Sequence, residues 1–303
     1  MDIRYQIFDP SGNITALVQG DDFTPEERIT INDAIMAKHA EVEQVGFLSN
    51  GTPEMTMAGG EFCGNATRSS ILAYLLQLRE PDTDGYCSGP NAVTMNIRTC
   101  GQVFEGGTKD MPAETPCNTT VWCRIPMRAE GPDGKLAPTY SVERTDARTT
   151  TVKMEGISFL IMEPSVLEQL QNEGADLKAA AHDLLREYGL DNDALGVIYL
   201  KNEKPAAEAS ADEDSTGYRS IVPTIWVKAI DTTFLENACG SGSIATTLAA
   251  CAAAPEGPAA YTIMQPSGKP LTVALELDAD GTVSAVNFSG PVATDGVMHT
   301  LNV

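Results

Sequence analysis

CGNATRSSILA, residues 63–73, and CGSGSIATTLA, residues 239–249, are two copies of one motif, one in each half of the 303-residue chain. The copies share their Cys-Gly start and their closing Leu-Ala pair, and a hydroxyl residue matches at Ser70 and Thr246. In each copy a strand-like run leads to the cysteine, and small residues then begin a helix. Such a duplication predicts two similar lobes whose matching cysteines face one cleft.

Two thiols directed at one carbon predict proton removal on one face and proton delivery on the other, which is racemisation or epimerisation without a cofactor. A cysteine at a helix start has a lowered thiol pKa, so we expect one thiolate base and one thiol acid. Backbone N–H groups of the small residues that follow would hold a carboxylate and stabilise enolate charge. A lone Cys-Gly is more often a small buried pair, but two copies in matched context favour catalysis.

Composition excludes several classes of function. The formal net charge is −22, which argues against a nucleic-acid partner because such binding depends on Lys and Arg neutralising phosphates. No apolar run approaches the ~20 residues of a membrane span, so no membrane partner is expected. The N-terminus lacks a basic leader followed by an apolar stretch, and we therefore expect a cytoplasmic protein.

The seven cysteines are odd in number and irregularly spaced, without a Cys-x-x-Cys pair, and none of the three histidines lies near one in sequence. This pattern favours free thiols and predicts no metal site. The chain also lacks a Gly-rich phosphate loop, so no pyridoxal phosphate is expected as electron sink.

Local patterns predict alternating strands and helices. In the first half Thr24-Pro25-Glu26-Glu27 predicts a capping box that starts a helix ending near His39. A second helix follows Cys63, and strands are expected at 3–8, 14–19, 44–48, 54–58, 92–99, 101–105 and 119–125.

The second half repeats this plan in outline. Strands are expected at 137–143, 151–162, 196–200 and 221–229, with an amphipathic helix near 165–188 and another after Cys239. The polar, acidic stretch 202–220 predicts a mobile surface loop.

These residues resemble the diaminopimelate epimerase superfamily, the cofactor-independent two-cysteine racemases and epimerases. The resemblance covers nearly the whole chain and rests on stretches 9–13 (DPSGN), 43–47 (EQVGF), 61–67 (EFCGNAT), 236–242 (ENACGSG), 265–268 (QPSG) and 288–292 (FSGPV). It implies an α+β fold of two pseudo-symmetric lobes, each a β-barrel-like sheet around a central helix. The lobes would comprise residues 1–128 with 291–303, and residues 129–290.

The resemblance also implies a homodimer and a set of site residues. Cys63 and Cys239 would be the acid/base pair acting on a small-molecule amino-acid substrate. The expected substrate-binding residues are Asn13, Glu43, Gln44, Gly64, Asn65, Glu236, Asn237, Gly240, Ser241 and Gly242, with the backbone of the residues after each cysteine on the α-carboxylate.

Substrate choice is expected to differ from that of diaminopimelate epimerases. Those enzymes typically carry Glu-Arg about two turns before the second cysteine, and the arginine helps hold the far carboxylate. Here residues 230–233 are Ile-Asp-Thr-Thr, without arginine. The motifs instead look like those of the histidine racemases that supply D-histidine for opine-type metallophores, in which a glutamate matching Glu43 lies near the site and Glu236 precedes the second cysteine.

Other functions stay open at this point. Within the same class they are diaminopimelate epimerisation and a broad-specificity amino-acid racemase. From other classes they are a non-catalytic amino-acid-binding protein on this fold and an isomerase that moves a double bond in an unsaturated acid.

Overall fold

The computed structural model describes residues 1–20, 23–77, 93–112, 114–131, 134–202, 216–228 and 231–303. Contacts divide the chain into two compact units, Met1–Ile125 with Phe288–Val303 and Pro126–Asn287. We refer to them as unit 1 and unit 2. Within the described residues, no helix is both long enough and apolar enough to cross a membrane.

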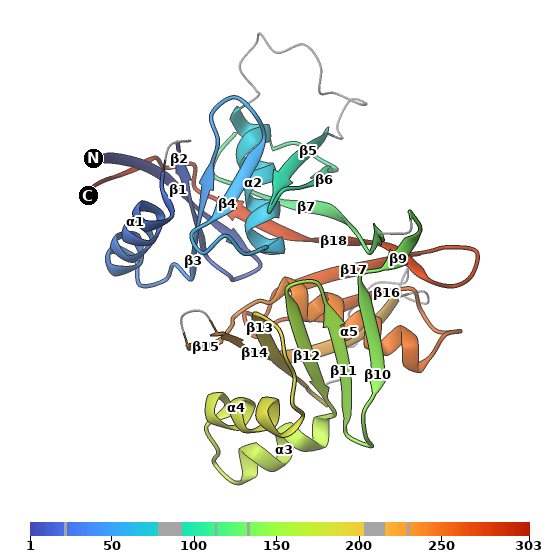
Figure 1. The fold of residues 1–303 in the computed structure, drawn as a ribbon. Helices are drawn as coiled ribbons and strands as arrows, with labels where there is room; N and C mark the ends of the chain where they lie inside the picture. Colours follow the sequence, from blue (N-terminus) through green and yellow to red (C-terminus); the bar gives the residue numbers. More distant parts are fainter. Residues whose placement is uncertain (21–22, 78–92, 113, 132–133, 203–215, 229–230) are drawn as a thin grey trace. The chain divides into compact units, whose positions relative to one another are not determined.

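Unit 1 is a closed barrel of eight strands around one helix (Figure 1). Each strand pairs with the next from β1 to β7, and β18 pairs with both β7 and β1. The elements are β1 (Asp2–Pro10), β2 (Thr15–Gln19), α1 (Pro25–Lys38), β3 (Gln44–Leu48), β4 (Glu54–Met57), α2 (Gly64–Gln77), β5 (Val93–Thr99), β6 (Gln102–Thr108), β7 (Cys117–Pro126), β18 (Val283–Thr294) and β19 (His299–Asn302).

Helix α2 is the core of this barrel. It contacts the six strands β1 to β6, and every residue from Gly64 to Leu75 is buried. A surface helix would bury one stripe only, so a helix buried all round must carry small, apolar or internally satisfied side chains. The barrel therefore encloses the first copy of the duplicated motif.

Unit 2 curves a second sheet around the second motif. Its elements are β8 (Arg128–Glu130), β9 (Leu136–Pro138), β10 (Tyr140–Arg144), β11 (Thr149–Met154), β12 (Ile157–Met162), α3 (Pro164–Asn172), α4 (Leu177–Glu187), β13 (Ala194–Leu200), β14 (Thr216–Val227), β15 (Thr232–Leu235), α5 (Gly240–Ala253), β16 (Ala260–Met264) and β17 (Pro270–Leu277). Helix α5 contacts β10 to β13, β16 and β17, as α2 contacts the strands of unit 1.

The two units repeat one topology. In unit 1, β2 and β3 are parallel and joined through α1, while β4 and β5 are parallel and joined through α2. In unit 2, β12 and β13 are parallel and joined through α3 and α4, while β14 and β16 are parallel and joined through β15 and α5. The predicted α+β fold of two pseudo-symmetric lobes is confirmed.

Several predicted elements need correction. The single helix expected near 165–188 is two helices, because Gly174 ends α3 with φ +65°, a backbone conformation that favours glycine. The strand expected at 151–162 is the hairpin β11–β12, which turns at Gly156 with φ +77°. Of the loop expected at 202–220, residues 216–220 belong to β14 and pair with β16, and 203–215 lie outside the described residues.

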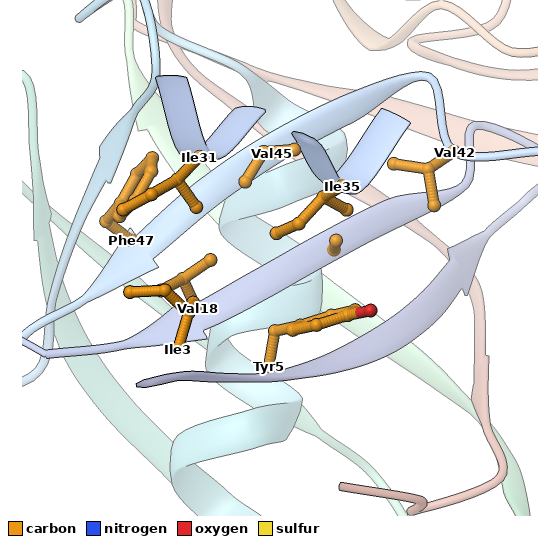
Figure 2. Packing of buried hydrophobic residues seen from close by; sticks show 9 residues of the cluster. Ile3, Tyr5, Val18, Ile31, Ile35, Val42, Val45 and Phe47 are labelled. Carbon is orange, nitrogen blue, oxygen red and sulfur yellow. The ribbon is translucent and has the colours of Figure 1, made fainter. Parts of the chain in front are cut away.

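Helix α1 covers the outside of the barrel at β3 and closes a second core (Figure 2). The predicted capping box is present: Thr24 Oγ1 accepts from Glu27 N at 3.2 Å, and Glu27 Oε2 accepts from Thr24 N at 2.8 Å. Ile35, fully buried, packs in one cluster with Tyr5 and Val45. This packing fixes β3, the strand that carries Gln44.

Ile35→Ala is expected to lower the free energy of unfolding by about 2–5 kcal/mol, because it removes buried methyl groups and leaves a cavity. Ile29→Ala on the same helix is the matched control: Ile29 is 54% exposed, and its loss should change stability by less than about 0.5 kcal/mol. Urea unfolding followed by circular dichroism measures both. Equal losses in the two variants would contradict the assignment of this core.

Candidate active site

Cys63 lies immediately before α2, and its sulfur closes the first turn of the helix. Ala66 N donates to Cys63 Sγ at 3.4 Å, and Thr67 N donates to the Cys63 carbonyl oxygen at 2.9 Å. The side chain is half-buried. The first N–H groups of a helix have no partner within the helix, so a side-chain acceptor here satisfies one of them.

Around Cys63 the barrel strands supply polar side chains. The Cys63 thiol donates to Gln44 Oε1 at 3.1 Å, and Gln44 Nε2 donates to Thr15 Oγ1 at 2.7 Å. Thr15 and Gln44 are register partners on the parallel strands β2 and β3, which places their side chains next to each other. The predicted site residue Gln44 therefore binds the thiol directly.

A second network joins three further predicted site residues to one that sequence reasoning left without a role. Arg68 Nη2 donates to Asn65 Oδ1 at 2.9 Å, Asn65 Nδ2 to Asn13 Oδ1 at 3.2 Å, and Asn13 Nδ2 to Glu43 Oε2 at 2.7 Å. Arg68 is fully buried. The structure thus brings Asn13, Glu43 and Asn65 together in unit 1.

Burial lowers the pKa of Arg68 to about 9, against the opposing influence of Cys123 and Cys63. The guanidinium therefore stays charged at neutral pH. Its Nη1 donates to the Gly290 carbonyl at 2.8 Å, and its carbon lies 4.7 Å from the Phe288 ring centroid. An arginine in the first turns of a buried helix is the signal that could have identified this group, since an unpaired buried charge is very costly.

In unit 2, Cys239 is the N-cap of α5. Its sulfur accepts from Gly242 N at 3.3 Å and lies 3.6 Å from Ser241 Oγ. Unlike Cys63, Cys239 is almost fully buried, with 3% exposed. Its backbone N–H donates to Gln265 Oε1 at 2.9 Å, and Gln265 Nε2 donates to Ser243 Oγ at 3.0 Å. Gln265 is a supporting residue that belongs to a motif named in the sequence, which gave it no role.

The protonation of Cys239 differs from the expectation for a helix start. Burial, followed by the charge and the hydrogen bond of Glu236, raises the pKa of Cys239 well above its usual value, while contacts with Ser241 and Gly242 N lower it less. Burial outweighs the helix N-terminus because a thiolate loses more hydration than the few N–H donors restore. The raised pKa favours the thiol form of Cys239, with Glu236 as its hydrogen-bond partner.

The remaining predicted residues of unit 2 differ in burial and in their contacts. A Cβ at Gly242 would lie 2.6 Å from Ile198 Cδ1 and 3.1 Å from Cys239 Sγ, so a larger residue here would require the Ile198 side chain to shift. Gly240 is the buried first residue of α5. Asn237 is exposed, and its backbone carbonyl oxygen accepts a hydrogen bond from Ser267 N at 3.0 Å. In unit 1, Gly64 likewise lies close to a neighbour, with a Cβ placed 3.2 Å from Phe288.

The hydroxyl match between the two motifs has a structural reason. Ser70 Oγ donates to the Ala66 carbonyl at 2.8 Å, and Thr246 Oγ1 donates to the Gly242 carbonyl at 2.8 Å. Both hydroxyls lie in helices enclosed by a sheet, where a polar atom without a partner would cost free energy. The matched positions therefore reflect matched burial.

Among the described residues, no group of three or more His, Cys, Asp or Glu side chains could hold a metal ion. Cys87 lies outside the described residues. Among the described cysteines outside the motif pair, Cys100, Cys117, Cys123 and Cys251, none forms a disulfide.

Comparison with known proteins places this site in context. Residues 2–297 match the family model described as the histidine racemase CntK N-terminal domain. A histidine racemase from Fusobacterium nucleatum is 26% identical over 260 residues, covering 81% of this chain and 82% of the relative. One from Staphylococcus aureus is 37% identical over 75 residues, covering 23% of this chain and 28% of the relative.

Solved structures share the fold at low sequence identity. A phenazine biosynthesis protein of the PhzF family from Bacillus anthracis covers the whole of both chains, with a TM-score of 0.64 and 11% identity. A hydroxyproline epimerase from Agrobacterium vitis, solved with trans-4-hydroxy-L-proline, covers 99% of this chain and 92% of its own, with a TM-score of 0.58 and 13% identity.

Glu236→Gln is expected to lower the pKa of Cys239, because the substitution removes the negative charge that favours the thiol and keeps only an amide oxygen as acceptor. The titration of Cys239 is the difference in thiolate absorbance between each protein and the same protein carrying Cys239→Ser, measured across a pH series. Glu163→Gln is the control, since Glu163 is a carboxylate of the same unit that pairs with Arg144. If Glu236→Gln left the Cys239 titration unchanged, the carboxylate would not govern this thiol.

Proposed function

The chain belongs to the histidine racemase family and is an isomerase that acts on amino acids; within this family we propose that its substrate is histidine and that Cys63 and Cys239 transfer the protons. The observation that carries the proposal is the repeated geometry. In each unit a cysteine lies at the N-terminus of a buried helix, next to a side-chain acceptor for its thiol proton. The proposed reaction needs no pyridoxal phosphate.

The proposed mechanism uses one thiolate and one thiol on opposite faces of the α-carbon. The thiolate removes the α-proton, the electron pair passes into the carboxylate as an enolate, and the other thiol protonates the carbon from the opposite face. Backbone N–H groups at the starts of α2 and α5 would hold the substrate carboxylate and stabilise the added charge. The roles exchange when the reaction starts from the other enantiomer.

Cys239 requires a proton acceptor before it can act as base, since its pKa is raised. Glu236 is bonded to this thiol and can take its proton, which leaves Cys239 as thiolate and Glu236 as a neutral acid. Cys63 instead has an amide as partner, and Gln44 cannot accept a full proton. We therefore propose that, in the enzyme as it first meets substrate, Cys239 with Glu236 is the base and Cys63 is the acid.

The chemistry of the described residues supports histidine over diaminopimelate. A second substrate carboxylate would require a cation where residues 231–233 carry an aspartate and two threonines. Asp231 is exposed and accepts from Trp226 Nε1 at 3.0 Å. Glu43 and Glu236, in contrast, are carboxylates that suit the N–H groups of an amine or an imidazole.

The first test is proton NMR of the reduced protein in deuterium oxide with a panel of L-amino acids and meso-diaminopimelate. We expect the α-proton of histidine to disappear while the others persist. Since different groups remove and deliver the proton, deuterium should enter the product enantiomer before the recovered substrate. Loss of the α-proton from several amino acids would indicate broad specificity, and from diaminopimelate alone an epimerase. Binding without exchange would indicate a non-catalytic protein.

Cys63→Ser and Cys239→Ser should each reduce histidine racemisation by at least about a hundredfold, because positioned acid–base groups contribute this much or more. Cys251→Ser is the matched control. Cys251 lies on α5 like the second motif, donates to the Pro258 carbonyl at 3.4 Å, and serine can keep that bond. Full activity in either motif variant would rule out the two-base mechanism.

We further propose a cytoplasmic location and a homodimer, of which the homodimer is what the resemblance to this superfamily implies. Multi-angle light scattering after size exclusion should give about twice the 32.2 kDa of one chain. A mass of one chain at micromolar concentration would contradict the dimer and leave the catalytic proposal untouched.

A further inference from the structure

Three hydrogen bonds in unit 1 form a continuous chain from the Cys63 sulfur to the main chain. Cys63 Sγ and Gln44 Oε1 are 3.1 Å apart, and Gln44 Nε2 and Thr15 Oγ1 are 2.7 Å apart. Thr15 Oγ1 and the Asn13 carbonyl oxygen are 3.0 Å apart. Thr15 is fully buried.

The Asn13 carbonyl oxygen, at the end of this series, fixes the direction of all three hydrogen bonds. A carbonyl oxygen only accepts, so Thr15 must donate its single hydroxyl proton to Asn13. The Thr15 oxygen can then only accept from Gln44, which must present its NH₂ group to Thr15 and its oxygen to Cys63. Amide oxygen and nitrogen are usually difficult to tell apart, but here this donor count decides the orientation.

An amide oxygen facing the sulfur distinguishes the two protonation states of Cys63. It accepts a hydrogen bond from a thiol, whereas beside a thiolate it presents negative charge to negative charge. Gln44 cannot correct this by rotating its amide, because rotation would place its oxygen against the Thr15 oxygen, whose proton is committed to Asn13. The orientation therefore costs free energy when Cys63 ionises.

Other groups near Cys63 act in the opposite sense. Ala66 N donates to the sulfur, and the Arg68 guanidinium interacts electrostatically with it. Both favour the thiolate. Two carboxylates are close in sequence: Glu43 is next to Gln44 and bonded to Asn13, and Glu61 lies two residues before Cys63. In the thiol–thiolate equilibrium of Cys63, the Gln44 amide thus favours the thiol, whereas the helix N-terminus and the arginine favour the thiolate.

We propose that Thr15 and Gln44 form a one-way hydrogen-bond relay that holds Cys63 as the neutral thiol in the substrate-free protein. Thr15 is a positioning residue, which acts on Cys63 only through the orientation of the Gln44 amide. That the thiol serves as the acid of racemisation rests on the proposed function. The protonation state itself does not, because it is a property of the protein without substrate.

The test is Thr15→Val, which keeps the side-chain shape and removes the hydroxyl. Gln44 is then free to rotate and donate to the sulfur. The midpoint of Cys63 alkylation by iodoacetamide should move to lower pH, and alkylation at neutral pH should become about fivefold faster, as expected for the effect of one hydrogen bond on the thiolate fraction. Mass spectrometry of the Cys63 peptide across a pH series separates this thiol from the others.

Two controls separate the relay from a general disturbance. Thr15→Ser keeps the hydroxyl, so the midpoint should stay at the wild-type value. Thr67→Val removes a buried hydroxyl that donates to the Cys63 carbonyl at 2.8 Å, not to the sulfur, and should also leave the midpoint in place. Gln44→Leu removes the acceptor itself and should lower the midpoint even if Thr15→Val fails to fold.

An unchanged or higher midpoint in both Thr15→Val and Gln44→Leu would overturn the relay. Failure of the proposed function would be seen separately, as a lack of α-proton exchange with histidine in the wild-type protein. The alkylation measurement uses no substrate, so neither result depends on the other.

Discussion

In both units a cysteine sulfur accepts a hydrogen bond from the backbone N–H three residues further along, at the first turn of a helix enclosed by a sheet. The distances are 3.4 Å for Cys63 and 3.3 Å for Cys239. A helix start needs acceptors for its first N–H groups, and a buried start cannot rely on water for them. The sulfur supplies one of these acceptors, and in the proposed function a substrate carboxylate supplies others. The arrangement of the strands, the small residues and the proposed chemistry all follow from this constraint.

Burial of each helix inside a sheet also explains the amino-acid composition of the motifs. A Cβ at Gly242 would press against the Ile198 side chain, and hydroxyls such as Ser70 and Thr246 donate to helix carbonyls four residues earlier. These features are needed to bury a helix on all sides and would be unnecessary on a surface helix. The duplicated residues are therefore explained largely by packing, and the two cysteines are what packing alone does not require.

Local signals allowed much of the fold to be predicted from the sequence. The capping box at Thr24, the two helices that follow the cysteines and most strands depend on residues close together in the chain. The break at Gly174 was missed because the apolar periodicity continues on both sides of it. The strand pairing of residues 216–220 was missed because it is a contact with the distant strand β16.

The sequence motifs predicted that certain polar residues lie together, but they did not predict the electrostatics around the cysteines. Motifs identified Asn13, Glu43 and Asn65, but not that a buried Arg68 joins them. The helix start suggested a lowered thiol pKa, whereas burial raises the pKa of Cys239. Burial depends on elements far away in sequence, so no local pattern could reveal its magnitude.

The two thiols have unlike partners, a neutral amide for Cys63 and a carboxylate for Cys239. The reaction proposed for them is symmetric, because mirror-image amino acids have equal free energies in water and their equilibrium ratio is one. The Haldane relation then requires the same kcat/KM for both enantiomers, however different the two partners are. Any difference in kcat between the two enantiomers must therefore be matched by a proportional difference in KM. The asymmetry of the two bases determines which enantiomer saturates the enzyme at the lower concentration. The direction of net conversion depends only on the concentrations of the two enantiomers.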